Sequence, residues 1–179
     1  MGSGKATMVG QRAPALSLAD TSGRAHQLPE AGEVAATVVS WTCNHCPYAL
    51  AWHPRIVDAA HDYEGRGVRF LAVNSNDAER YPADSRAAMQ ERVESEDWPF
   101  PYLHDESQAA ARAWNAQVTP HLFVLDGELV VRYEGAADAD HMTPAENAVW
   151  LREALDSVLG GEEPARPATD PVGCSIKWK

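Results

Sequence analysis

The sequence predicts an α/β domain in which helices flank a mixed central sheet. Two apolar runs rich in β-branched residues, 34–41 and 68–74, are separated by a helical pattern. This order is typical of parallel strands that are joined by a right-handed crossover. An Asp-Gly pair at 126–127 lies between two further apolar runs and predicts an antiparallel hairpin. The expected order of elements is β-β-β-α-β-α-α-β-β-α.

The first half of the domain is expected to begin with a small hairpin. Two short segments, 15–18 and 25–28, flank an Asp-Thr-Ser-Gly turn and predict an N-terminal β-hairpin extension. After the strand at 34–41, residues 49–64 carry apolar side chains at helical spacing. Pro54 is expected to kink this helix or to start a new helical segment.

The second half is expected to contain three helices and one hairpin. They are a polar helix at 82–97, a short Ala-rich helix at 105–114, strands at 121–125 and 128–133, and a helix at 144–159. Asp105 and Gln108 match a capping box at the start of the short helix. Thr143, Pro144 and Glu146 match the start signal of the last helix.

Length and composition limit the class of protein. A chain of 179 residues is the size of one domain and buries a core without disulfides. We expect a disordered start at 1–8, a domain at 9–160 and a Pro-rich tail at 161–179. The chain has 15 basic and 26 acidic residues and a net charge of −11, which argues against nucleic-acid and membrane partners. No signal-peptide pattern is seen, so the expected location is the cytoplasm, where cysteines are usually reduced.

Three cysteines are present, and two of them form a C-x-x-C motif. Cys43 and Cys46 lie between the buried strand at 34–41 and a helix. At a helix start the unpaired backbone N–H groups favour a thiolate, so we expect the pKa of Cys43 to be lowered. Cys43 is then the predicted nucleophile and Cys46 the predicted resolving cysteine. A zinc site is disfavoured, because the sequence has no second C-x-x-C and no H-x-x-x-H.

These residues resemble the thioredoxin-like superfamily. The resemblance rests on the WTCNHCP segment after a buried strand and on Thr119-Pro120 before a later strand. It implies that Pro120 is a cis-proline packed against the C-x-x-C, and that the backbone of Thr119 pairs with an extended substrate chain. Trp41 is expected to pack beside the cysteines and to contribute to substrate binding. The opening GQRAPALSLADTSG resembles the subgroup that holds TlpA-like thioredoxins and AhpC/TSA-type redoxins.

The resemblance implies a thiol-disulfide oxidoreductase without an organic cofactor, whose redox group is the Cys43–Cys46 disulfide. The expected partners are protein thiols and disulfides, including a thioredoxin or glutathione system. A partly protonated His45 would stabilise the Cys43 thiolate, so we expect a more oxidising pair than that of thioredoxin. Thioredoxin also uses an acidic proton acceptor. Glu33 and Asp77 are the candidates here, but both are better explained as solvated charges.

Two other functions remain open. Peroxiredoxins place Pro seven residues and Thr three residues before the reactive cysteine, and here these positions are Ala36 and Ser40. The missing proline disfavours a thiol-dependent peroxidase with antioxidant function without excluding it. Copper-binding thioredoxin folds use a C-x-x-x-C-P motif and a distant histidine, for which His121 and His45 are candidates.

The third cysteine, Cys174, lies in the C-terminal segment GCSIKWK. It is either a third redox cysteine on a tail that folds over the active site, or a packed small residue in a segment that covers an apolar patch with Ile176 and Trp178. We favour the second interpretation.

Overall fold

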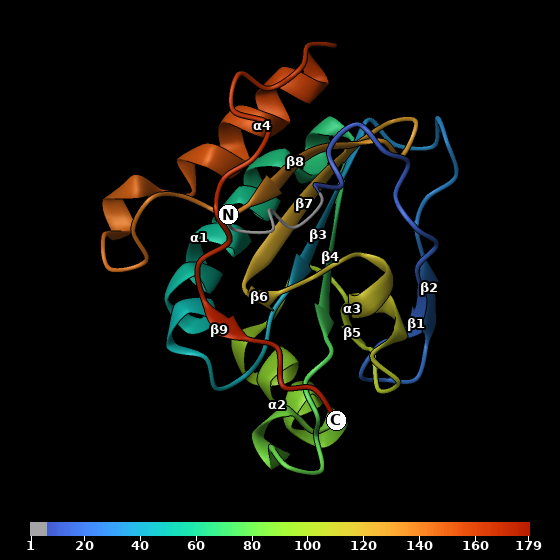
Figure 1. Cartoon of the computed structure of the whole chain (residues 1–179), viewed down its shortest axis with the longest axis vertical. Coiled ribbons are helices and arrows are strands. Elements are labelled where there is room, and N and C mark those ends of the chain that lie inside the picture. Colours follow the sequence, from blue (N-terminus) through green and yellow to red (C-terminus); the bar gives the residue numbers. More distant parts are fainter. Residues whose placement is uncertain (1–6) are drawn as a thin grey trace, which may run out of the picture.

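Figure 1 shows the computed structural model, which describes residues 7–179. The centre is a sheet in the order β5-β4-β3-β7-β8, formed by β3 (Ala36–Trp41), β4 (Val68–Asn74), β5 (Tyr102–His104), β7 (His121–Asp126) and β8 (Val131–Gly135). Two small sheets accompany it, β1 (Ser17–Ala19) with β2 (Ala25–Gln27), and β6 (Val118–Thr119) with β9 (Cys174–Ser175). The α-helices are α1 (Pro47–Tyr63), α2 (Arg86–Glu96), α3 (Ala109–Ala113) and α4 (Val149–Leu159). Most of the predicted disordered start, residues 1–6, lies outside the described residues.

β3 is the central strand of the sheet. It pairs in parallel with β4 and antiparallel with β7. β5 extends the parallel side and β8 extends the antiparallel side. The predicted mixed sheet and both predicted hairpins are therefore confirmed. Because β3 is central, the loop after Trp41 begins at the middle of one edge of the sheet. Loops from the neighbouring strands lie next to it there.

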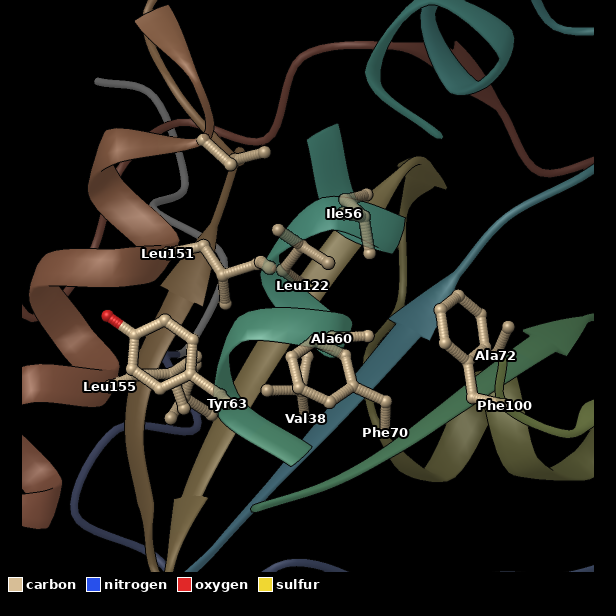
Figure 2. Packing of buried hydrophobic residues seen from close by; sticks show 14 of the residues in the cluster. Val38, Ile56, Ala60, Tyr63, Phe70, Ala72, Phe100, Leu122, Leu151 and Leu155 are labelled. Carbon is tan, nitrogen blue, oxygen red and sulfur yellow. The ribbon is translucent and has the colours of Figure 1, made fainter. Parts of the chain in front are cut away.

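The two faces of the sheet are covered by different elements. Successive residues of a strand point to opposite faces, so Val38 and Val39 belong to separate cores. Val38 packs with Ile56 of α1 and Leu155 of α4, and Figure 2 shows these helices against the sheet. Val39 packs with Trp114 after α3 on the other face. The helices flanking the sheet agree with the predicted fold class.

α1 is one helix that continues through Pro54, so it is not divided into two segments. Pro54 lacks the N–H that would bond to the carbonyl of Leu50. Leu50 is 41% exposed, so this turn of the helix faces solvent. α1 starts at Pro47, two residues before the predicted start, because proline suits the first helical turn.

The other helices start later than predicted. A 3-10 turn occupies Pro82–Asp84, and α2 follows it with Ser85 as its N-cap. The predicted capping box at Asp105 and Gln108 is wrong, since Gln108 adopts a φ of 66° and is itself the N-cap of α3. α4 begins at Val149, because the predicted start signal forms only a 3-10 turn and the two residues after that turn have positive φ.

Three short strands were not predicted, namely β5, β6 and β9. β5 follows Pro99 and Pro101, which are incompatible with a helix interior. β9 belongs to the C-terminal tail, which runs from the end of α4 past β6, in red in Figure 1. No helix within residues 7–179 is both long and apolar enough to cross a bilayer.

Candidate active site

Both cysteines of the C-x-x-C motif lie in the loop that connects β3 to α1. Cys46 is the N-cap of α1, whereas Cys43 lies three residues before it. The helix start therefore holds Cys46, and the expected position of Cys43 is corrected. The residues are almost completely buried, 1% exposed for Cys43 and 0% for Cys46, and their sulfurs are free thiols.

The Thr119-Pro120 segment lies against both sulfurs. Its peptide bond is cis. The Thr119 hydroxyl is 3.3 Å from Cys43 Sγ, and Cys46 Sγ donates a hydrogen bond of 3.2 Å to the Thr119 carbonyl. The structure therefore brings together two segments that are more than 70 residues apart in the sequence.

The two thiols of the motif share a hydrogen bond that affects their pKa values in opposite directions. The contact with Cys43 lowers the pKa of Cys46 to about 4, and the backbone N–H of Ala49 and the contact with Cys174 also lower it. The contact with Cys46 raises the pKa of Cys43, and burial and the Asp84 carboxylate raise it further. The pair therefore titrates as one unit that shares a proton, and the expected lowering of the pKa of Cys43 by the helix start is not found.

His45 is directed at a buried carboxylate. Its Nδ1 lies 2.6 Å from Oδ2 of Asp84, and its ring stacks on Tyr81 at 5.5 Å. One nitrogen of His45, one oxygen of Asp84 and Cys43 Sγ all lie within 4.8 Å of one another. The imidazole is therefore beside Cys43, as predicted, but it is paired with a negative charge that was not predicted.

Asp84 is fully buried and accepts three hydrogen bonds. They come from the backbone of Asn44 at 2.7 Å, from the Asn74 amide at 3.0 Å and from the Asn76 amide at 3.1 Å. Of the two candidate proton acceptors, Asp77 is buried and not solvated as expected, and neither it nor Glu33 belongs to the group around Cys43, which holds Asp84 instead. The two asparagines could have been placed here, because Asn74 ends β4 and Asn76 follows it, at the edge where β3 also ends. No sequence pattern identifies Asp84.

Two residues from other elements hold the loop in place. Arg92 of α2 donates to the Cys43 carbonyl at 3.0 Å and to the Asn44 side chain at 3.2 Å. Tyr102 of β5 donates to the same Asn44 oxygen at 2.9 Å. The loop is therefore held by contacts with α2 and β5.

Trp41 does not fit the predicted role in substrate binding. Its side chain is fully buried, donates to Ser75 at 3.0 Å and packs against Trp114 and Phe123 in the core beneath α3. The cause is strand alternation, which turns Trp41 toward the core on that face of the sheet.

Cys174 lies beside the C-x-x-C pair. β9 pairs antiparallel with β6, and the register places Cys174 opposite Thr119. The Cys174 thiol hydrogen-bonds to Cys46, and its residue packs against the small cluster around both cysteines. Burial and the contact with Cys46 raise the pKa of Cys174 to about 11. The chain's own tail therefore occupies the backbone edge that was predicted to pair with a substrate.

One group of potential metal ligands occurs here among residues 7–179, formed by Cys43, His45 and Asp84. Both Asp84 oxygens already accept hydrogen bonds from amides. His121, which the copper hypothesis requires, does not belong to this group. Its Nδ1 accepts from the Gln117 backbone at 3.2 Å, and its ring stacks on Phe123.

A mixed sheet whose central strand leads into two cysteines, facing a cis-proline, defines a thioredoxin-like fold. The thioredoxin domain of a thiol-disulfide oxidoreductase from Bacteroides vulgatus shares this fold with a TM-score of 0.59 and 14% identity, over 70% of this chain and 86% of that one. The family model named AhpC/TSA family matches residues 9–134. The chain therefore belongs to the AhpC/TSA family, which confirms the predicted redoxin resemblance.

Two solved structures are more similar over nearly the full length. An uncharacterized conserved protein from Geobacillus kaustophilus has 38% identity and a TM-score of 0.88, covering 96% of this chain and 92% of that chain. A hypothetical protein from Sinorhizobium meliloti 1021 has 32% identity and a TM-score of 0.91, and the match covers 98% of this chain and 97% of that chain. Both matches extend beyond residue 134, where the family match ends. No curated protein matches the chain.

Proposed function

We propose that the protein is a thiol-disulfide oxidoreductase that exchanges disulfides with protein partners. The observation that carries this proposal is the direct contact of the Cys43 and Cys46 thiols at the start of α1. Two thiols in contact are placed to close to a disulfide. Membership of the AhpC/TSA family supports redox chemistry at these thiols.

In the proposed mechanism Cys43 attacks a sulfur of the substrate disulfide. Its proton passes along the hydrogen bond to the Cys46 thiolate, which acts as the base. A mixed disulfide forms, and the other substrate sulfur leaves as a thiolate. Cys46 then passes its proton to the substrate thiolate that has left and attacks Cys43 Sγ, which releases the second substrate sulfur and leaves a Cys43–Cys46 disulfide. Two electrons have passed to the substrate.

The cycle is closed by a second dithiol. A protein thiol, or the thioredoxin or glutathione system, returns two electrons to the Cys43–Cys46 disulfide. The scheme uses sulfur chemistry alone and needs no organic cofactor. Because exchange is reversible, the reduction potential of the pair relative to its partners sets the direction of electron flow.

The test uses insulin reduction with dithiothreitol as the electron source, together with serine variants of each cysteine. We expect C43S and C46S to lose turnover. We also expect C46S to accumulate a mixed disulfide with the substrate, because its resolving thiol is absent, whereas C43S does not. A mixed disulfide trapped only by C43S would reverse the assigned roles, and full turnover by both variants would refute the proposed function.

A peroxidase activity is the second candidate. It is favoured by the family and by the Thr119 hydroxyl, which lies 3.3 Å from Cys43 Sγ and could donate to a bound peroxide. The Ala36 position, where peroxiredoxins carry proline, argues against it. Hydrogen peroxide consumption with dithiothreitol as reductant distinguishes the two activities, because a peroxidase consumes peroxide in the absence of any disulfide substrate.

A further inference from the structure

The C-terminal strand places a third sulfur in line with the C-x-x-C pair. We propose that Cys174 is a redox cysteine that takes over the disulfide from the pair by forming a Cys46–Cys174 bond within the same chain. This inference rests on the proposed function, which supplies the Cys43–Cys46 disulfide. It replaces the simpler view that Cys174 is only a packed small residue.

The order of the three sulfurs supports this step. Cys46 packs in one small cluster with Cys43 and Cys174, and its sulfur lies 3.2 Å from the carbonyl of Thr119, the residue directly opposite Cys174. Both Cys43 and Cys174 act on the pKa of Cys46. The side-chain contacts of Cys43 are instead with Cys46 and Thr119. Cys46 is therefore the middle sulfur. Attack on a disulfide requires this order, with the attacked sulfur between the incoming and the leaving sulfur.

The backbone of the tail is adapted to this close approach. Gly173 precedes Cys174 and lies so close to Thr119 that a Cβ at this position would overlap with the Thr119 carbonyl oxygen. Only glycine therefore allows Cys174 to pair directly opposite Thr119. The pairing of β6 with β9 places the Cys174 side chain at the cysteine cluster.

The residues after Cys174 fix the tail firmly. Ile176 is 3% exposed and packs in the core beneath α3. The Lys177 backbone accepts hydrogen bonds from the backbone of Asp77 at 2.8 Å and from the Gln108 side chain at 2.9 Å. Trp178 stacks under the Arg112 guanidinium at 4.4 Å. The tail is thus a docked element that holds Cys174 at the active site.

The proposed step starts from the Cys43–Cys46 disulfide that remains after a substrate has been reduced. Cys174 loses its proton to solvent, and its thiolate attacks Cys46 Sγ. The Cys46–Cys174 bond forms while the Cys43–Cys46 bond breaks, and Cys43 leaves as a thiolate that takes up a proton. The chain holds one disulfide before and after, so no external oxidant is needed. Cys43 becomes free for another attack.

The experiment oxidises the reduced C43S protein with diamide, which removes two electrons and two protons from a pair of thiols. Peptide mapping by mass spectrometry without reduction then locates the disulfide. We expect one intrachain bond between Cys46 and Cys174. The matched control is C46S, in which Cys43 and Cys174 are expected to remain unlinked within the chain, because their sulfurs are not neighbours.

A folded C43S protein, checked by circular dichroism, that yields only free thiols or chain-to-chain dimers would overturn the inference. A second test maps oxidised wild-type protein against G173A, in which the clash with Thr119 displaces β9. We expect a Cys46–Cys174 fraction in the wild type and its loss in G173A; an equal fraction in both would contradict the docking argument. Insulin reduction is measured separately, so failure of the proposed function is distinguished from failure of this step.

Discussion

At the scale of single residues, the charges around Cys43 decide its redox behaviour. The Asp84 carboxylate is buried, and the amides of Asn74 and Asn76 donate to its oxygens. An oxygen of Asp84 lies within 4.8 Å of the Cys43 sulfur, and the carboxylate raises the pKa of that thiol. His45 lies against the same carboxylate and, when protonated, compensates that charge. The two side chains therefore act on the Cys43 thiolate with opposite sign.

The first prediction concerns the reduction potential of the Cys43–Cys46 pair. H45Q leaves the Asp84 charge uncompensated and destabilises the reduced thiolate, so the potential becomes more negative. D84N removes the charge that raises the pKa of Cys43, so the potential becomes more positive. Each shift should be on the order of 10–30 mV. Equilibration with glutathione buffers measures the reduction potential of each variant.

Glutamine is a better replacement for His45 than proline in this experiment. Proline at position 45 would also remove the backbone N–H that donates to Cys43 Sγ. Shifts of the same sign in H45Q and D84N would contradict the opposing roles of the two charges.

The second prediction concerns the pH dependence of the thiolate. Because the pKa of Cys46 is lowered to about 4, the reduced pair carries a thiolate at neutral pH. Its ultraviolet absorbance should disappear as the pH falls through about 4. C43S should move this step to higher pH, since the contact with Cys43 is the main cause of the low pKa. C46S should abolish the step, and a reduced wild-type protein without any thiolate at neutral pH would contradict the assignment.

Sequence reasoning found the residues of the motif better than their surroundings. Cys43, Cys46 and Thr119 are brought together as predicted, because the strand-to-helix loop and the residue before cis-Pro120 meet at one sheet edge. Asp84 was missed, because it lies in a 3-10 turn inside a segment that reads as a polar helix. Its burial depends on tertiary contacts that no local pattern encodes.

At the scale of elements, a buried ion pair ties α1 to the loop before α4. Arg55 donates to both oxygens of Asp138 at 2.9 Å, and Trp52 donates to the same carboxylate at 2.7 Å. The backbone N–H of Ala148 donates to it as well, at 2.9 Å. These contacts join the helix that carries Cys46 to α4, so the position of the active-site loop depends on them.

The third prediction is that R55A destabilises the fold strongly. It leaves the buried Asp138 carboxylate without its main partner, and loss of one member of a buried pair costs about 3–5 kcal/mol. The matched control is R69A, whose exposed pair with Glu33 spans 3.8 Å and should contribute about 0–1 kcal/mol. Urea unfolding measures the free energy of unfolding of both variants. Equal losses would show that burial does not determine the effect.

The elements that were predicted well are the ones with long regular patterns. β3, β4 and α1 combine apolar periodicity with clear flanking signals, and the structure has them close to the expected bounds. The short strands β5, β6 and β9 have two or three residues each, too few for a period to appear. They form because partner strands supply their hydrogen bonds, which is information from outside the segment.

At the scale of the whole molecule, the C-terminal tail completes both the core and the active site. Ile176 fills a position in the core beneath α3, and Cys174 covers the cysteine cluster. Ile176 and Trp178 of the tail pack against an apolar cluster, as the sequence predicts. The register that places Cys174 opposite Thr119 could not be predicted, because it depends on contacts with Asp77 and other distant residues.

The docked tail packs against the cysteine cluster through Cys174 and occupies the backbone edge of Thr119. In the proposed function a substrate that pairs with Thr119 has to displace β9, so we expect the docking free energy of the tail to control access. Ile176 is the main apolar anchor, and truncation of a buried isoleucine to alanine costs about 2–5 kcal/mol. In I176A this loss falls mainly on the docked state of the tail, since the rest of the core remains packed.

The fourth prediction is therefore that I176A exposes the thiols without unfolding the domain. Alkylation of Cys43 and Cys46 by iodoacetamide should accelerate about tenfold for each 1.4 kcal/mol of docking free energy that is lost. V172A is the matched control, because Val172 lies in the same tail but is 42% exposed and should leave the rate unchanged. If I176A lowers the melting temperature while alkylation stays as slow as in the wild type, the tail is a structural element of the core and does not control access to the site.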